Sequence, residues 1–126
     1  MTIEQAVFQA DELKPNQVAK AQKITWLSQL DRRIFKEIIS AHESDSDTPK
    51  EFSGYTQDTL PDTELLAKAP YDDIYPYFLH MHIDLANLEY DKYNNSLLLF
   101  SNAWGQFARA YHREHRFKQE ANSMKF

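Results

Sequence analysis

The sequence predicts a mainly α-helical fold, a bundle of four helices with a long central connection that has room for a small β-hairpin. Apolar residues recur every three or four positions in four stretches of the chain, which is the spacing of one helix face. Only two glycines occur in 126 residues, whereas turn-rich β folds need many residues that tolerate positive φ. With 42% hydrophobic residues, a chain of this length can bury the core of one domain.

The first helix is expected over residues 2–13. Thr2 and Gln5 have the spacing of a capping box, in which each side chain bonds the backbone N–H of the other residue. Proline disfavours a helical conformation in the residue before it, so Pro15 predicts that the helix ends there. The expected buried face comprises Ile3, Ala6, Val7 and Ala10.

The second helix is expected over residues 17–42, with Asn16 as its N-cap. Its apolar positions step by three or four: Ile24, Leu27, Leu30, Ile34, Ile38 and Ala41. Its charged residues should occupy the other faces: Lys23, Asp31, Arg32, Lys36 and Glu37.

Residues 43–69 form the long central connection. Pro49, Gly54 and Pro61 interrupt it, and no helical period is sustained. Connections of this length tend to be functional or to contain short structure. We expect extended pieces at residues 51–55 and 63–67, which can pair as a hairpin.

The third helix is expected from residues 70–73 to about residue 91. Asp72 or Asp73 would cap it, and Pro76 falls in its first turn, where a missing N–H costs little. The expected buried stripe comprises Ile74, Phe78, Met81, Leu85 and Leu88.

Residues 92–95 should join this helix to a fourth, which Asn94 or Asn95 would cap. Glycine lowers the stability of a helix when it lies in the interior, so Gly105 suggests that a neighbouring backbone approaches closely there. The helical domain then covers residues 1–116, and residues 117–126 form a C-terminal tail. The expected inward face of the fourth helix comprises Leu97, Phe100, Trp104, Phe107 and Tyr111.

Charge is distributed unevenly along the chain. The net charge of −5 disfavours bulk electrostatic binding to nucleic acid. Residues 43–73 contain nine acids against Lys50 and Lys68, whereas residues 109–126 contain five lysines or arginines against two glutamates. Two interpretations remain open: two solvated surfaces, or complementary surfaces through which copies of the chain associate head to tail.

No pattern in the sequence indicates catalysis, a cofactor or a metal. The chain has no cysteine, which excludes disulfides and thiolate chemistry. His80 and His82 lie two apart, so on a helix they point in nearly opposite directions. His112 and His115 share a helix face, but neighbouring arginines would repel a cation.

Paired acids have simpler explanations than a catalytic or calcium site. Helix capping accounts for Asp72 and Asp73. Asp45 and Asp47 lack the central glycine and final glutamate of a calcium loop. The chain is therefore expected not to be an enzyme.

The N-terminal residues have neither a basic leader nor a continuous apolar run, and no stretch reaches the roughly 18 apolar residues of a membrane span. An intracellular protein without a membrane partner is expected.

Three stretches carry a resemblance to a known family: residues 23–39, beginning Lys-Ile-Thr-Trp-Leu; residues 52–55, Phe-Ser-Gly-Tyr; and residues 70–100, beginning Pro-Tyr-Asp-Asp-Ile-Tyr. In these stretches the chain resembles phage or prophage head–tail connector (adaptor) proteins of Gram-positive bacteria. The block Lys-Tyr-Asn-Asn-Ser at residues 92–96 is the most particular. Pro76 departs from the helix-forming apolar residue expected in such proteins.

The resemblance implies an adaptor-like helical subunit of the virion neck, assembled in the host cytoplasm. Its partners would be further copies of itself in a ring of twelve, the portal protein, and a tail or stopper (head-closure) protein, while DNA passes through without specific binding. The connection and the tail should reach neighbours, so the expected contact residues are Phe52, Tyr55, Arg109, Arg113, Arg116, Phe117, Lys118 and Phe126.

A second hypothesis is a small helical phage chaperone or regulator that binds one protein partner through a helix-in-groove contact. Such a protein would be a monomer or dimer on its own.

Overall fold

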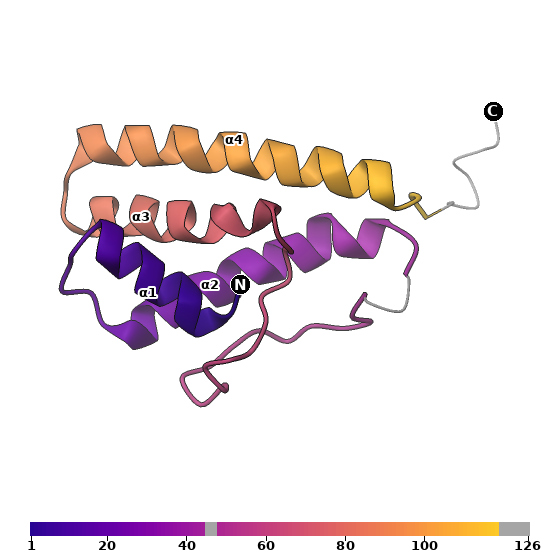
Figure 1. Cartoon of the computed structure of the whole chain (residues 1–126), viewed down its shortest axis with the longest axis horizontal. Coiled ribbons are helices and arrows are strands. Elements are labelled where there is room, and N and C mark those ends of the chain that lie inside the picture. Colours follow the sequence, from indigo (N-terminus) through magenta and orange to yellow (C-terminus); the bar gives the residue numbers. More distant parts are fainter. Residues whose placement is uncertain (45–47, 119–126) are drawn as a thin grey trace.

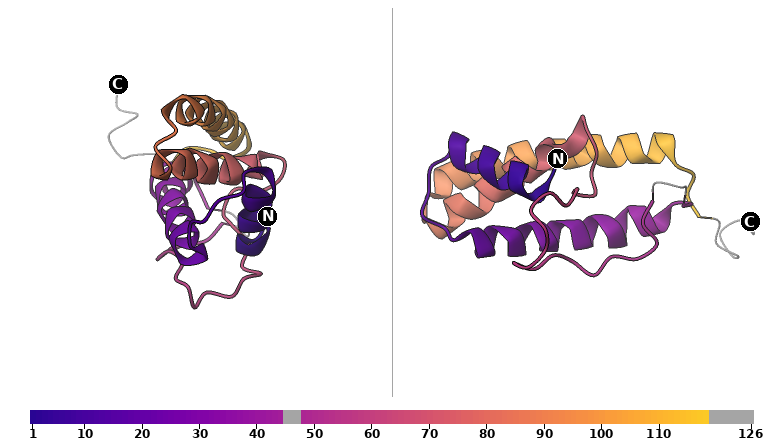
Figure 2. Two further views of the ribbon diagram at one scale, coloured as in Figure 1. Left: turned by 90° about the vertical axis from the view of Figure 1, so that its left-hand side faces the viewer. Right: turned by 60° about the horizontal axis from the view of Figure 1, so that its bottom comes forward.

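A computed structural model describes residues 1–44 and 48–118 and contains four α-helices and no β-strand in those residues. The helices are α1 (Ile3–Leu13), α2 (Lys20–Glu37), α3 (Ile74–Ala86) and α4 (Tyr90–Glu114). They form three layers, with α1 and α2 side by side, α3 above both, and α4 on the other side of α3 (Figures 1 and 2). The predicted mainly α, four-helix fold is confirmed.

The N-terminal end of α1 is capped as the sequence predicts. The Thr2 hydroxyl accepts a hydrogen bond from the Gln5 N–H at 3.1 Å, and the Gln5 side chain accepts one from the Thr2 N–H at 2.9 Å. The central connection also reaches this end, because the N–H groups of Ile3 and Glu4 donate to the carbonyls of Thr63 and Pro61. The first turn of α1 is thus tied to a distant part of the chain.

Helix α2 is shorter than residues 17–42 at both ends. Asn16 does not cap it, because its side-chain oxygen accepts from the Val18 N–H at 3.0 Å, and Ala19 is the N-cap. At the other end a short 3-10 helix, η1 (Ile39–Ala41), follows. The predicted solvent faces of α2 are also wrong at two positions, since Lys23 and Asp31 are buried.

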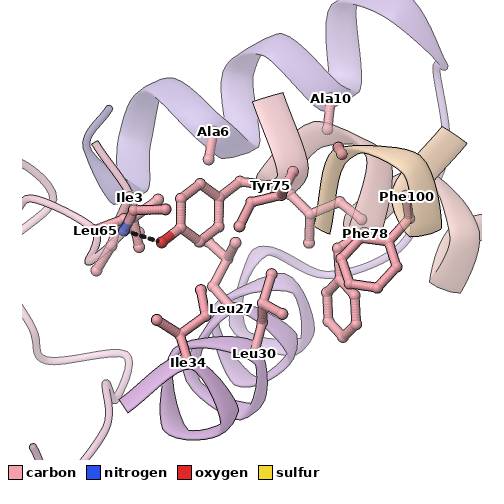
Figure 3. Packing of buried hydrophobic residues seen from close by; sticks show 14 of the residues in the cluster. Ile3, Ala6, Ala10, Leu27, Leu30, Ile34, Leu65, Tyr75, Phe78 and Phe100 are labelled. Atoms are coloured by element: carbon pink, nitrogen blue, oxygen red, sulfur yellow. Dashed lines mark hydrogen bonds between the residues drawn. The ribbon is translucent and has the colours of Figure 1, made fainter. Parts of the chain in front are cut away.

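Asp31 organises the central connection. Its carboxylate is fully buried and accepts hydrogen bonds from the hydroxyls of Tyr55 (2.5 Å) and Tyr75 (2.7 Å) and from the Leu66 N–H (3.1 Å). The Tyr75 hydroxyl in turn accepts from the Ala67 N–H at 2.7 Å. Figure 3 shows the Tyr75 ring in the core between α1 and α2. One carboxylate therefore joins α2, α3 and both halves of the connection.

The ionisation of this cluster is shifted by its surroundings. Burial raises the pKa of Asp31, against the opposing effect of its hydrogen-bond donors. Burial and the adjacent Asp31 charge raise the pKa of both Tyr55 and Tyr75. Both phenols therefore remain protonated and act as donors at neutral pH.

The predicted hairpin at residues 51–55 and 63–67 is wrong, because the two pieces do not bond to each other. Their backbone bonds instead to α2 side chains, to the Tyr75 hydroxyl and to the backbone of residues 1–3. The Tyr55 N–H donates to the Ser28 hydroxyl at 2.9 Å, and Arg32 donates to the Ser53 carbonyl at 2.9 Å. With these groups and the Leu66 N–H satisfied, little remains for strand pairing.

The boundary between the third and fourth helices differs from the prediction. Helix α3 follows a 3-10 turn, η2 (Tyr71–Asp73), and ends at Ala86, not near residue 91. Leu88 then adopts φ 59°, which reverses the chain, so residues 92–95 lie within α4 and do not join the helices. Pro76 does lie in the first turn of α3, but Asp73, the N-cap, makes no side-chain capping bond.

Helix α4 buries a single stripe against α3, whose members are Ser96, Phe100, Ala103, Phe107 and Ala110. Leu85, Leu88 and Leu97, predicted to be buried, are 42%, 68% and 37% exposed. The predicted backbone approach at Gly105 is also wrong. A Cβ there would meet the Arg109 guanidinium at 3.1 Å, so the space above Gly105 holds a side chain of its own helix.

We predict that Asp31→Ala lowers the free energy of unfolding by about 3 kcal/mol, because two buried hydroxyls and one N–H lose their acceptor. Asp58→Ala, which removes an exposed aspartate of the same connection, should change it by less than about 0.5 kcal/mol. Urea denaturation measures both values. Equal effects of the two substitutions would contradict the role of Asp31.

Candidate functional site

The end of α4 is fixed to the end of α2. Arg116 and Lys118 flank a β-bridge between Phe117 and His42, in which the Glu43 N–H donates to the Arg116 carbonyl at 2.7 Å and the Lys118 N–H donates to the Ala41 carbonyl at 2.9 Å. The first residues of the predicted tail are therefore part of the folded body.

Two hydrogen-bonded histidines, His42 and His112, lie next to this bridge. His42 is fully buried, with Nδ1 2.6 Å from the Ile38 carbonyl and Nε2 2.8 Å from Nδ1 of His112. Because a carbonyl only accepts, Nδ1 of His42 carries a proton, and in a neutral pair Nε2 accepts from His112. Phe117 stacks on both rings, at centroid distances of 4.3 Å from His42 and 4.7 Å from His112.

Five of the predicted contact residues gather at this end of the molecule, and we call them the basic end: Arg109, Arg113, Arg116, Phe117 and Lys118. All five are exposed. Within residues 1–44 and 48–118, none of the four cations forms an ion pair with an acid. The remaining tail residue, Phe126, lies outside the described residues.

The other two predicted contact residues lie elsewhere. Tyr55 is only 9% exposed, and its hydroxyl is bonded to Asp31, so its function is internal. Phe52 is half-buried and packs against Tyr55 and Phe35. The structure does not bring either residue to the basic end.

The acidic part of the central connection lies beside the first turns of α1. A bridge joins Glu64 to Thr2, and the neighbouring carbonyls accept from the α1 N–H groups. We call the exposed carboxylates of this region the acidic surface: Glu4, Asp62, Glu64 and Asp73. The charge asymmetry of the sequence thus becomes two separate surfaces of the folded chain.

An apolar groove follows the outer side of α1, and the sequence analysis did not identify it. Phe8 and Leu13 are 64% and 69% exposed there. Both lie outside the periodic buried face of α1, and two large apolar residues on the other face were the sequence feature that could have predicted the groove. The residues that line this α1 groove are Met1, Gln5, Phe8, Gln9, Glu12, Leu13 and Asp72.

Six large apolar residues between positions 85 and 99, in and near the turn between α3 and α4, are exposed, and we call them the turn patch. Its members are Leu85, Leu88, Tyr90, Leu97, Leu98 and Leu99, each at least 37% exposed.

The two histidines of α3 have separate surroundings. His80 bonds the Ala10 carbonyl at 3.0 Å, whereas His82 stacks on Trp26 at 4.8 Å and meets Phe78 edge-on at 4.5 Å. Burial lowers the pKa of both. Among the described residues, no three histidines or acids are grouped to hold a metal ion.

None of the helices in the described part of the chain has the length and apolar character required to cross a membrane. No protein-family model, curated protein or solved structure matches the chain.

The lowered pKa of His82 predicts a pH effect on stability. Between about pH 6.5 and the lower folded-state pKa, the unfolded chain binds more protons, so the free energy of unfolding decreases as the pH falls through that window. His82→Phe keeps a ring against Trp26 without a titrating group and should reduce this decrease. Urea denaturation across this pH range tests it, and parallel curves for the two proteins would contradict the prediction.

Proposed function

We propose that this chain is a structural, non-enzymatic subunit of the neck of a tailed phage or prophage. It forms a ring below the portal, as a head-to-tail connector, and docks tail or stopper proteins. Two things support the proposal: the resemblance of three stretches to connector proteins, and the presence of two oppositely charged surfaces on one chain. The second observation carries the argument.

A ring built from identical subunits needs two different surfaces on each subunit that fit one another. The basic end lies at the C-terminal end of α4, and the acidic surface lies beside the first turns of α1 (Figure 1). Neither the four cations nor Glu4, Asp62 and Asp73 form an ion pair within residues 1–44 and 48–118. Contact between neighbouring copies would bring these charges together and fix their orientation.

In this proposal the ring has twelve copies, as in the family that the chain resembles. DNA passes through its centre without specific contacts, which suits a net charge of −5. The portal lies on one side of the ring, and the tail or stopper protein lies on the other.

The turn patch favours a second candidate, a small helical phage chaperone or regulator. Six exposed apolar side chains in and near one turn are typical of a surface that binds a protein. Such a protein would form a complex with one partner and would be absent from finished particles.

Imaging of the neck in purified particles tests the proposal. We expect the chain in symmetric copies between portal and tail. In particles made with Arg109→Glu and Arg113→Glu together, we expect the ring occupancy to decrease about tenfold or more, because repulsion replaces attraction at each contact.

Lys36→Glu is the matched control, since Lys36 is an exposed cation of α2 outside the basic end. It should leave ring occupancy unchanged. Particles that carry a normal neck without this chain would contradict the connector function and favour the chaperone or regulator.

A further inference from the structure

We propose that Phe117 of one copy inserts into the α1 groove of the next copy, so that the basic end and the acidic surface meet around it. This inference rests on the proposed function and specifies the contact between its subunits.

The α1 groove has room for an aromatic side chain and a partly apolar lining. It is an open hollow of about 500 Å³, with Phe8, Leu13 and Met1 as its apolar lining. Phe8 and Leu13 are each more than 60% exposed to water. Covering these apolar side chains would remove them from water and lower the free energy of the complex.

The surroundings of the groove carry more negative than positive charge. The Met1 ammonium lies 3.3 Å from both Asp72 and Glu64, so these three groups together keep one negative charge. Glu12 lines the groove and is exposed without an ion-pair partner in residues 1–44 and 48–118. The acidic surface adjoins it, because the Leu65 N–H, next to Glu64, donates to the Met1 carbonyl at 3.0 Å. An occupant of the groove is therefore expected to be an apolar group accompanied by positive charge.

The basic end offers such a group on the same chain. Phe117 is 55% exposed, and Arg116 and Lys118 stand directly beside it in the sequence. The bridge to His42 and the stacking on two histidine rings already hold Phe117 in place. Docking it would cost less conformational entropy than docking a free tail would.

Phe117 does not line the groove of its own chain, because the bridge to His42 holds it beyond the C-terminal end of α4. That end of α4 lies at the opposite end of the molecule from the C-terminal end of α1 (Figure 1). A contact between two different surfaces leaves one of each free on every dimer, so further copies can add. Such association closes into a ring where the geometry permits.

Cysteine cross-linking tests the contact directly, because the natural chain has no cysteine. Gln9→Cys, in the groove, and Lys118→Cys, next to Phe117, each change one exposed side chain and keep both Phe8 and Phe117, so both proteins should fold and the contact is retained. Mixed and treated with a short bis-maleimide, they should give a heterodimer as the main product, whereas each alone should give little dimer. The double variant should give a ladder of higher oligomers.

Leu98→Cys is the matched control. Leu98 is 61% exposed on α4 and belongs to neither surface of the proposed contact. Mixed with Gln9→Cys, it should give no more than background cross-linking.

Sedimentation of variants without cysteine provides a second measurement. Phe117→Ala and Phe8→Ser should each weaken self-association at least about tenfold. A mixture of the two retains one intact Phe117 and one intact groove, so it should form a 1:1 dimer that does not grow further.

Three results would overturn the inference: dimers of Gln9→Cys with itself as the main product, self-association that neither Phe117→Ala nor Phe8→Ser weakens, or a wild-type chain that stays monomeric at roughly millimolar concentration. A ring seen in the neck together with any of these results would remove this contact but leave the proposed function. If cross-linking is as expected but the chain is absent from the neck, the contact stands and the proposed function is contradicted.

Discussion

The carboxylate of Asp31 is the interaction on which the arrangement of this fold depends. A buried carboxylate is costly unless it is fully hydrogen-bonded, and here two tyrosine hydroxyls and one backbone N–H supply the donors. These donors come from α3 and from both halves of the central connection. The connection therefore has one position in which the charge is satisfied, although it contains no strand or helix of its own in the described residues between η1 and η2.

Two ion pairs, each with one buried partner, extend the same principle to the remaining helices. Lys14, just after α1, bonds Asp84 of α3 at 2.6 Å, and Asp84 also accepts from Ser96 of α4 at 2.7 Å. Lys23 of α2 bonds Asp11 of α1 at 2.6 Å. Among the described residues, no buried side-chain nitrogen or oxygen lacks a hydrogen-bond partner. Each helix is thus tied to another by a polar contact as well as by apolar packing, and such contacts penalise a helix that slides along its neighbour.

The helices could be predicted because they depend on residues close together in the sequence. The buried charge, the α3–α4 boundary and the groove could not, because they depend on the folded chain. The apolar period and the Thr2 capping box depend only on neighbours in the sequence, so the existence of all four helices followed from them. An aspartate between apolar positions is normally a solvent-facing residue, and only Tyr55 and Tyr75, far along the chain, make Asp31 a buried one. The α3–α4 boundary depends on Leu88 in a left-handed conformation that leucine rarely adopts, so no residue signalled it. The basic end was visible as composition, whereas the α1 groove required the fold.

The contrast between interior and surface charges bears on how the molecule is used. Inside the described part of the chain, every buried ionisable side chain has a hydrogen-bond partner, and polar contacts join neighbouring helices. Outside, the cations of the basic end have no acid partner in the described residues, and neither have Glu4, Glu12, Asp62 and Asp73. Grouping exposed charges of the same sign on one surface does not stabilise the fold, because like charges repel. Segregation on two separate surfaces, with Phe117 at one and a partly apolar groove at the other, is compatible with the head-to-tail association proposed above.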